Sequence, residues 1–493
     1  MYFHNFLLFS ITWMILTLLF GELTGTRLRH EPVSLLNDDL GPYWEERNAS
    51  YWLQQAQKQL IQRLERFRHA RGNGDGPLDS RVAKNIILFL GDGLSMSTLT
   101  AARILKGQRE GFSGEECQLA VEQFPFSGLS KTYCINKQTA DSACSATAYL
   151  AGVKTSGGTV GQSGDGFNVE PITQWAQREG KATGVVTTTR LTDASPAGTY
   201  AHVQNRAEEL EIARQLVEDE PGRGMKVILG GGLGKFVSER RDDRDLLEQW
   251  LTSNPDGCFA RNLEDLRGCR HGNGSLLGVF GDNHLDYHLA ANKEQPRLSE
   301  MTAMAIERLS QHPKGYFAFI EGGRIDHGHH ETRAGYALDE MLEFDAAIDT
   351  AINMTDPHDT LIVVTADHAH TLSLSGYARR GTSILGLDKT QTDVDGVPYS
   401  ILNYAIGKWQ SLNKEGKREN PAKTLSKTSY FPSYIHGRKG VHSGEDVAIF
   451  AQGPQSHLFS GVMEQNLLPH LMGYAACLGQ GLTLCNETPV MPD

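Results

Sequence analysis

The stretch EGGRIDHGHHE, residues 321–331, carries the densest set of reactive side chains in the chain. It holds three histidines and three carboxylates within eleven residues, namely Glu321, Asp326, His327, His329, His330 and Glu331. Asp326 and His330 are four residues apart, so they share one face if the segment is helical. Carboxylate oxygens and imidazole nitrogens together suit zinc. Because so many polar groups rarely pack as core, the stretch predicts a metal site.

Three further candidate ligand positions lie next to predicted strands. Asp92 stands between two glycines in LGDGLS, where a cation or phosphate could approach the backbone, although Gly-Asp-Gly is also a common turn. Asp367 and His368 end a buried apolar run in TADHAH, and His442 precedes another run in GVHSGEDV. Alone, each pattern is more typical of a turn or core residue than of a ligand. Their shared position at strand ends favours a common site.

Two segments could handle a phosphate group. Ser142 opens an alanine-rich helix in TADSACSATAYLAG, where free N–H groups and the helix dipole favour an anion; an N-cap serine is the structural alternative. The segment TTTRLTDASPAGTYAHVQNR carries Asp193, Ser195 and Arg206. Arginine can clamp two phosphate oxygens, although most arginines simply lie on the surface.

Short apolar runs that alternate with helical patterns must position these residues. The runs are Asn85–Leu90, Thr183–Thr189, Met225–Gly230, Tyr316–Gly323, Thr360–His368 and Asp446–Gly453. Strands that are apolar on both faces and separated by helices predict an α/β fold with a mostly parallel central sheet between two layers of helices. Ligands of such sheets bind at the carboxyl ends of the strands, where most of these runs place Gly, Asp, Glu or His.

The ends of the chain indicate its compartment. Residues 1–25 read as a signal peptide, because the apolar run Phe6–Phe20 is shorter than the roughly 20 residues of a membrane span. Residues 26–80 read as an N-terminal region with a surface helix near 40–70 and a Gly-rich linker from 71. The polar C-terminus has no apolar tail of a lipid-anchor signal, so we expect soluble secretion into the extracellular space.

Composition excludes some classes of protein. The chain has 493 residues, 39% of them apolar, and a net charge of −12. A sizeable core is therefore expected and global disorder is excluded. An acidic chain without clustered basic residues is a poor nucleic-acid binder, so we expect no nucleic-acid partner. An anionic substrate would have to be held by local positive charge.

Cysteines and glycosylation motifs agree with an oxidising compartment. The seven cysteines include two close pairs, Cys258/Cys269 and Cys477/Cys485, which we expect to form disulfides. The pairing of Cys117, Cys134 and Cys144 stays open. Four Asn-x-Ser/Thr motifs suit a secreted surface, at Asn48, Asn273, Asn353 and Asn486.

Taken in order, these motifs closely resemble the animal branch of the alkaline phosphatase family. The likeness runs from about residue 40 to 480 and includes KNIILFLGDGLSMSTLTAARILKGQ and GEDVAIFAQGPQSHLFSGV. It implies a catalytic domain over residues 81–493, a homodimer, and a small irregular crown insertion, expected at 377–438 where the sequence lacks a clear period. The implied activity is hydrolysis of small phosphate monoesters at alkaline pH through a phosphoserine intermediate.

The resemblance also assigns roles to residues. Ser142 matches the serine that is transiently phosphorylated, and Arg206 matches the phosphate-binding arginine. The implied ligands are Asp326, His330 and His442 for one zinc ion, Asp92, Asp367 and His368 for a second, and Asp92, Ser195 and Glu321 for magnesium. Two zinc ions about 4 Å apart would serve the attacking and leaving oxygens of an in-line displacement.

Some positions depart from the vertebrate pattern. Asp193 stands where vertebrate members have histidine, so with His327 it forms a mixed pair that gives the magnesium site different surroundings. The vertebrate calcium site is expected to be lost, because Gly281 follows Phe280 and Gln295 replaces an aspartate. The first vertebrate disulfide is not reproduced, since the segment after Gly152 is shorter, whereas Cys477/Cys485 resembles the second.

Two other functions compete with this interpretation. One is a phosphodiesterase or sulfatase on the related superfamily sheet, which the arginine clamp and the complete ligand set disfavour. The other is a catalytically inactive secreted binding protein, which the intact Ser142 disfavours.

Overall fold

The computed structural model describes residues 41–71, 78–392, 395–410, 412, 415–418, 420–423 and 425–486. Contacts divide the chain into Met1–Trp44 and Glu45–Asp493, and the elements that build the site belong to the second unit. The predicted signal peptide lies outside the described residues. Among the helices that the structure describes, none is both long and apolar enough to cross a membrane.

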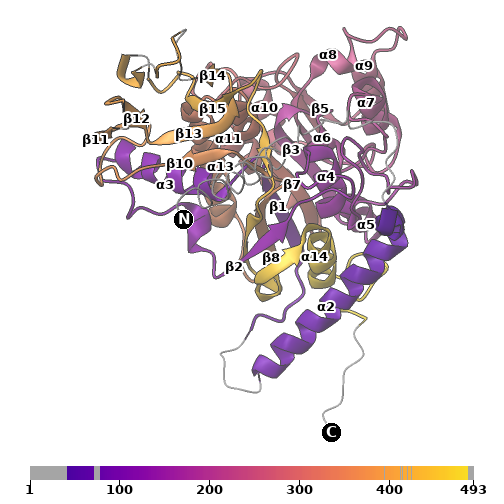
Figure 1. Ribbon diagram of the computed structural model, residues 1–493. Helices are drawn as coiled ribbons and strands as arrows, with labels where there is room; N and C mark the ends of the chain where they lie inside the picture. The colour runs from indigo at the N-terminus through magenta and orange to yellow at the C-terminus, as the bar shows by residue number, and fades with distance from the viewer. Residues whose placement is uncertain are drawn as a thin grey trace, which may run out of the picture. The chain divides into compact units, whose positions relative to one another are not determined.

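A ten-stranded sheet forms the centre of the second unit, in the order β18-β2-β17-β8-β1-β7-β3-β4-β6-β5 (Figure 1). Its strands are β1 (Asn85–Gly91), β2 (Phe126–Lys131), β3 (Ala182–Arg190), β4 (Val227–Gly231), β5 (Cys258–Ala260), β6 (Leu276–Val279), β7 (Tyr316–Gly322), β8 (Thr360–Ala366), β17 (Val447–Gln452) and β18 (Gly461–Glu464). Every neighbouring pair is parallel except the two made by β17. The predicted α/β class with a mostly parallel sheet is confirmed.

Helices cover both faces of this sheet (Figure 1). Successive side chains of β1 point to opposite faces, so Ile87 and Phe89 join one core while Ile86, Leu88 and Leu90 join the other. The first core lies under α3 (Met96–Arg109), α10 (Leu263–Gly268), α11 (Leu298–Leu309) and α13 (Ala334–Met354). The second lies under α2 (Ala49–Arg71), α4 (Ser142–Ala151), α5 (Ile172–Arg178), α7 (Glu209–Glu218), α9 (Leu246–Ser253) and α14 (Leu468–Ala476).

The sequence predicted the six long apolar strands within a few residues but missed β2, β5, β6 and β18. These four lie at or near the two edges of the sheet, and β2 (FSGLSK) is half-exposed and polar, so it lacks the continuous apolar run of a buried strand. The predicted surface helix is α2, which begins at Ala49 rather than near residue 40 and follows a 3₁₀ helix at Gly41–Arg47.

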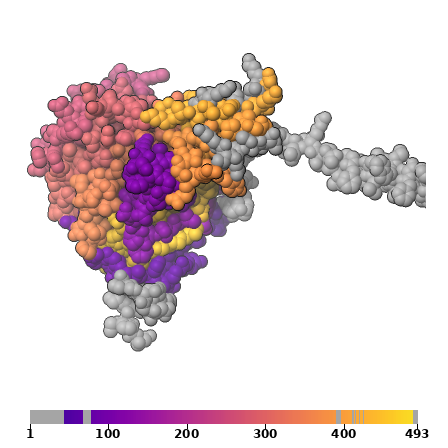
Figure 2. All heavy atoms as spheres, turned by 90° about the vertical axis from the view of Figure 1, so that its left-hand side faces the viewer, coloured from indigo at the N-terminus to yellow at the C-terminus, as the bar shows by residue number. Residues whose placement is uncertain are grey.

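The sequence predicted an irregular crown, but the structure shows regular strands in this segment. The structure extends the crown to the whole segment between β9 (Ala369–His370) and β16 (His442–Ser443), because β10 (Leu372–Leu374) belongs to its sheet. That four-stranded sheet has the order β10, β13 (Leu402–Gly407), β15 (Pro432–His436) and β14 (Trp409–Gln410), and β11 (Leu387–Thr392) pairs with β12 (Pro398–Ser400). Strands of two to six residues are too short to show a period in sequence. The crown lies beside α3, as the orange and purple surfaces of Figure 2 show.

Three disulfides join Cys134 to Cys144, Cys258 to Cys269 and Cys477 to Cys485, which leaves Cys117 free. The first of these settles the pairing that the sequence left open. The four asparagines of the glycosylation motifs are all exposed: Asn48, Asn273, Asn353 and Asn486.

Candidate metal centre and nucleophile

The carboxyl ends of four adjacent parallel strands, β8, β1, β7 and β3, meet at the site. Asp92 follows β1, Asp367 follows β8, Glu321 lies near the end of β7, and Asp193 comes shortly after β3. Hydrogen-bond register aligns Leu90 of β1 with Glu321 of β7. Backbone pairing in the sheet therefore brings together carboxylates that are more than 270 residues apart in sequence, such as Asp92 and Asp367.

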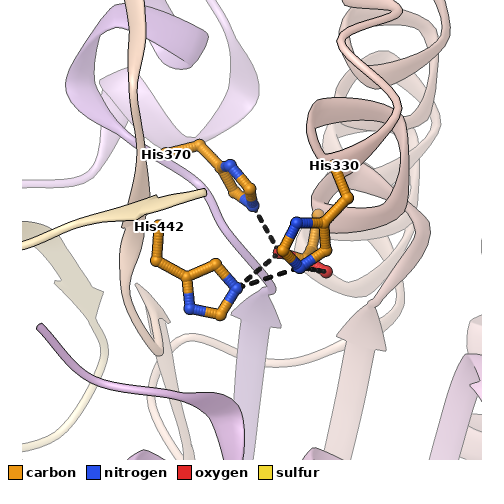
Figure 3. A group of neighbouring side chains, drawn as sticks. His330, His370 and His442 are labelled. Atoms are coloured by element: carbon orange, nitrogen blue, oxygen red, sulfur yellow. Dashed lines mark hydrogen bonds and ion pairs between the residues drawn. The ribbon is translucent and has the colours of Figure 1, made fainter. Parts of the chain in front are cut away.

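The first ligand group surrounds Asp326 on the short helix α12 (Arg324–His330) (Figure 3). His330, one turn later, has its Nε2 3.3 Å from Asp326 Oδ2, and His442 has its Nε2 3.4 Å from Asp326 Oδ1. The Nδ1 atoms of these histidines lie 2.7 Å from Gly440 O and 2.9 Å from Ala140 O. Donation from both Nδ1–H groups leaves the two Nε2 lone pairs facing each other at 3.1 Å. Two lone pairs cannot bond each other, so a cation fits between them.

Asp92, Asp367 and His368 form the second ligand group, and all three are buried. His368 Nε2 lies 3.1 Å from Asp367 Oδ2 and 3.6 Å from Asp92 Oδ1. One oxygen of Asp367 accepts the backbone N–H of Gly93 at 3.0 Å and that of His368 at 2.8 Å. The other oxygen, and Asp92 Oδ1, have no hydrogen-bond partner among the described residues. Such buried carboxylate oxygens call for a cation.

Charge at the site agrees with this donor chemistry. Burial, reinforced by neighbouring carboxylates, raises the pKa of Asp92 well above its usual range, and burial raises that of Asp367 to about 6. Burial also lowers the pKa of His368, so its imidazole is neutral and able to bind a metal. Crowded carboxylates and neutral imidazoles together fit divalent cations of the zinc type.

Ser142 lies beside the second ligand group. It is the first residue of α4, whose N-cap Asp141 accepts the backbone N–H of Cys144 at 3.3 Å, and it is buried. Its Oγ is 3.3 Å from His368 Nε2 in the second group. His442 of the first group stacks on His368 with ring centroids 3.5 Å apart. The hydroxyl therefore sits at a helix N-terminus beside the second group, whose histidine stacks on a histidine of the first.

Ser195 approaches the Asp92 oxygen that does not face His368, and Glu321 is a further buried carboxylate at the strand ends. Ser195 Oγ is 3.5 Å from Asp92 Oδ2. Glu321 accepts hydrogen bonds from the hydroxyls of Thr187 and Thr189 on β3 through one oxygen, while the other oxygen has no partner among the described residues. Burial raises the pKa of Glu321 to about 8. An all-oxygen donor set of this kind suits magnesium.

Arg206 reaches the site from the loop before α7. Its guanidinium contacts Asp193 at 2.7 Å and Asp141 at 3.4 Å. Asp193 also forms an ion pair with Arg190 at 3.1 Å. Burial would raise the pKa of Asp193, but the charges of Arg206 and Arg190 outweigh it and hold that pKa below the usual range. His327, predicted as the partner of Asp193, is in the same group, together with His284, whose ring lies 4.3 Å from it.

Comparisons with known proteins agree with this geometry. A family model described as alkaline phosphatase matches residues 83–478. The chain is 43% identical to the tissue-nonspecific alkaline phosphatase of Gallus gallus, over 90% of this chain and 92% of that protein. It is 41% identical to the human tissue-nonspecific isozyme, over 90% and 91%. The chain belongs to the alkaline phosphatase family.

Solved structures of bacterial alkaline phosphatases share the fold. The enzyme of the Antarctic bacterium TAB5 superposes with a TM-score of 0.63 at 26% identity, covering 81% of this chain and all of that one. The Thermus thermophilus enzyme superposes with a TM-score of 0.66 at 25% identity, covering 84% and 97%. These relatives favour a phosphatase over the diesterase, sulfatase and inactive binding protein considered from the sequence.

Sequence reasoning overlooked two histidines of the candidate ligand groups, His370 and His284. His370 donates a hydrogen bond from Nε2 to Asp326 Oδ1 at 2.5 Å and is fully buried. It stands two residues after His368 in TADHAH, and residues two apart in an extended chain point to the same side. This spacing could have revealed it. His284, in the loop between β6 and α11, gave no such signal, because Asp193 and His327 are 91 and 43 residues away from it in sequence.

Proposed function

We propose that this alkaline phosphatase hydrolyses small phosphate monoesters through a phosphorylated Ser142, with two zinc ions and one magnesium ion per chain. Asp326, His330 and His442 would hold one zinc ion, Asp92, Asp367 and His368 the other, and Asp92, Ser195 and Glu321 the magnesium. The observation that carries the proposal is the position of Ser142 Oγ, at a helix N-terminus and 3.3 Å from a ligand histidine.

The reaction consists of two displacements at phosphorus. Ser142 Oγ forms a bond to phosphorus while the bond to the alcohol oxygen breaks, and the alcohol leaves with a proton. A water oxygen then attacks the phosphoserine, the Oγ–P bond breaks, and inorganic phosphate leaves while Ser142 regains its proton. When bound, the divalent ions supply Lewis-acid stabilisation of negative charge on the attacking and leaving oxygens.

The chain itself holds the phosphate. The free N–H groups at the start of α4 would donate to an anion bound beside Ser142. Arg206 offers a planar fork of donors for two non-bridging oxygens. Its two carboxylate contacts, Asp193 and Asp141, hold the guanidinium near the site before substrate arrives. This local positive charge explains how a chain with a net charge of −12 can bind an anionic substrate.

We further propose that the enzyme is a secreted, glycosylated homodimer without a tight calcium site. Secretion is supported by the apolar segment Phe6–Phe20 and by the exposed glycosylation motifs; a 38% identical relative from Bombyx mori is named a membrane-bound alkaline phosphatase. Gln295 argues against calcium, because its amide donates to Phe280 O at 3.0 Å and accepts the Asp286 N–H at 2.8 Å. The neutral Gln295 side chain thus links Phe280 to Asp286 by hydrogen bonds, where a calcium site would need a negatively charged ligand.

Acid-quenched enzyme, digested and analysed by mass spectrometry after incubation with substrate, tests the proposal. We expect phosphate on Ser142 and none in the Ser142→Ala variant, with zinc content unchanged. Ser145→Ala is the matched control, because Ser145 lies one turn further along α4 and is equally buried. Phosphate trapped on another residue, or full turnover by Ser142→Ala, would overturn the assignment.

A further inference from the structure

Two short paired strands, which we call the neck, connect the crown to the rest of the enzyme, and they contain two histidines of the first ligand group, His370 and His442. The chain enters the crown through β9 (Ala369–His370) and leaves it through β16 (His442–Ser443), and these strands pair with each other. The ladder has two residue pairs, His370 with His442 and Ala369 with Ser443. The residue pair that closes the base of the crown therefore also contacts Asp326 (Figure 3).

Beyond the neck, the crown holds the helix that carries the other two ligands. Gly440 N donates to His330 O at 2.7 Å, and Gly440 O lies 2.7 Å from His330 Nδ1. Two residues after the same helix ends, Phe431 N donates to Thr332 O at 2.7 Å. Backbone atoms on either side of crown strand β15 thus hold the C-terminal end of α12.

A buried side-chain relay makes a third connection. Tyr404, on crown strand β13, places its hydroxyl 2.8 Å from His329 Nδ1, and His329 Nε2 lies 2.9 Å from Thr98 Oγ1 on α3. All three side chains are fully buried or nearly so. Hydroxyls can donate or accept, so the relay is satisfied with either neutral tautomer of His329. Because His329 directly precedes His330, the relay fixes the rotation of α12 between the crown and α3.

We infer that the crown and the first zinc site order each other, with Tyr404 and His329 acting as positioning residues for the ligands on α12. The inference rests on the proposed function, because it requires zinc at Asp326, His330 and His442. Groups that orient metal ligands change metal affinity typically by 10- to 100-fold when removed. Linkage is reciprocal, so zinc that prefers an ordered crown must also order the crown.

Zinc affinity of Tyr404→Phe tests the first half of the inference. The variant keeps the ring and loses only the hydroxyl, and we expect the weaker-held zinc to dissociate at roughly 10-fold lower chelator concentration than in the wild type. His329→Gln should behave alike. Tyr200→Phe is the matched control, because it loses a buried hydroxyl that donates to Leu191 O, on the opposite core. Equal zinc affinity in Tyr404→Phe and Tyr200→Phe would overturn the inference.

Hydrogen exchange tests the reciprocal half on the full-length protein. On removal of zinc by a chelator, the amides of β13 and β15 should exchange faster, while those of β1 and β7 keep their protection. Circular dichroism of each variant verifies that it folds. Zinc that binds without any change in crown exchange would refute this inference and leave the proposed function standing. A protein that binds no zinc would instead refute the proposed function.

Discussion

His288 makes a pH-dependent contact between a surface loop and α13, and this contact should weaken at alkaline pH. The residue lies in the loop between β6 and α11, and its Nδ1 is 2.7 Å from Asp339 Oδ2 while its Nε2 is 3.5 Å from Glu343 Oε2. Its backbone N–H donates to Glu340 at 2.7 Å, and Arg109 also binds Asp339. The hydrogen bond to Asp339 raises the pKa of His288, although burial opposes the shift.

The sign of the pH effect follows from this raised pKa. A group whose pKa is higher in the folded state contributes its full stabilisation below its unfolded value of about 6.5 and loses it as pH rises through the folded value. The protonated imidazole donates to Asp339 and pairs its positive charge with Glu343, whereas the neutral ring keeps only the hydrogen bond to Asp339. The loop is therefore tied to α13 more strongly at pH 6 than at pH 9.

His288→Asn isolates the charge, because the asparagine amide can still donate to Asp339. Hydrogen bonds to charged groups contribute about 1.5–3 kcal/mol, and the His288 side chain is 25% exposed, so we expect a loss of about 1–2 kcal/mol at pH 6 and a few tenths at pH 9. With an unfolding entropy of about 2.1 cal/mol/K per residue, the shift in Tm at pH 6 is about 1–2 °C.

Differential scanning fluorimetry at both pH values, at one scan rate and with saturating metal, measures this difference. His358→Asn is the control, since His358 is exposed in the turn before β8. A loss in Tm that is equal at pH 6 and pH 9, or larger at pH 9, would refute the reasoning.

Three other perturbations test separate parts of the molecule. Arg206→Ala should lower kcat/KM by about 10- to 100-fold and weaken inhibition by inorganic phosphate, because each lost charge-assisted hydrogen bond is worth about 1.5–3 kcal/mol; the surface variant Arg214→Ala should leave both unchanged. His442→Ala should lower zinc by about one ion per chain, as measured by inductively coupled plasma mass spectrometry, and an unchanged stoichiometry would contradict its role as a ligand. The double variant Cys477→Ser/Cys485→Ser opens a short loop with a sequence separation of 8. It should lose about 2.5 kcal/mol, or roughly 2–3 °C in Tm, and an unchanged Tm would show that the loop is already ordered without the bond.

The sequence by itself determined the features that depend on neighbours along the chain. Asp326 and His330 share a helical face because they are four residues apart, and Ser142 begins a helix because the alanines after it favour one. The long strands of the sheet centre were readable because burial on both faces demands continuous apolar runs. Family resemblance then connected motifs that spacing alone could not connect.

Only the tertiary structure decided which distant residues meet. His370 reaches Asp326 across 44 residues and His442 reaches His330 across 112, through the pairing of β9 with β16 and the docking of α12. The same holds for Tyr404 and His329, which are 75 residues apart. Periodicity records which face of an element is buried but not what lies against it, because strand order and crown packing are set by contacts between elements. Most candidate ligands could therefore be predicted from the sequence and its family resemblance, whereas the hydrogen bonds that orient them are visible only in the folded structure.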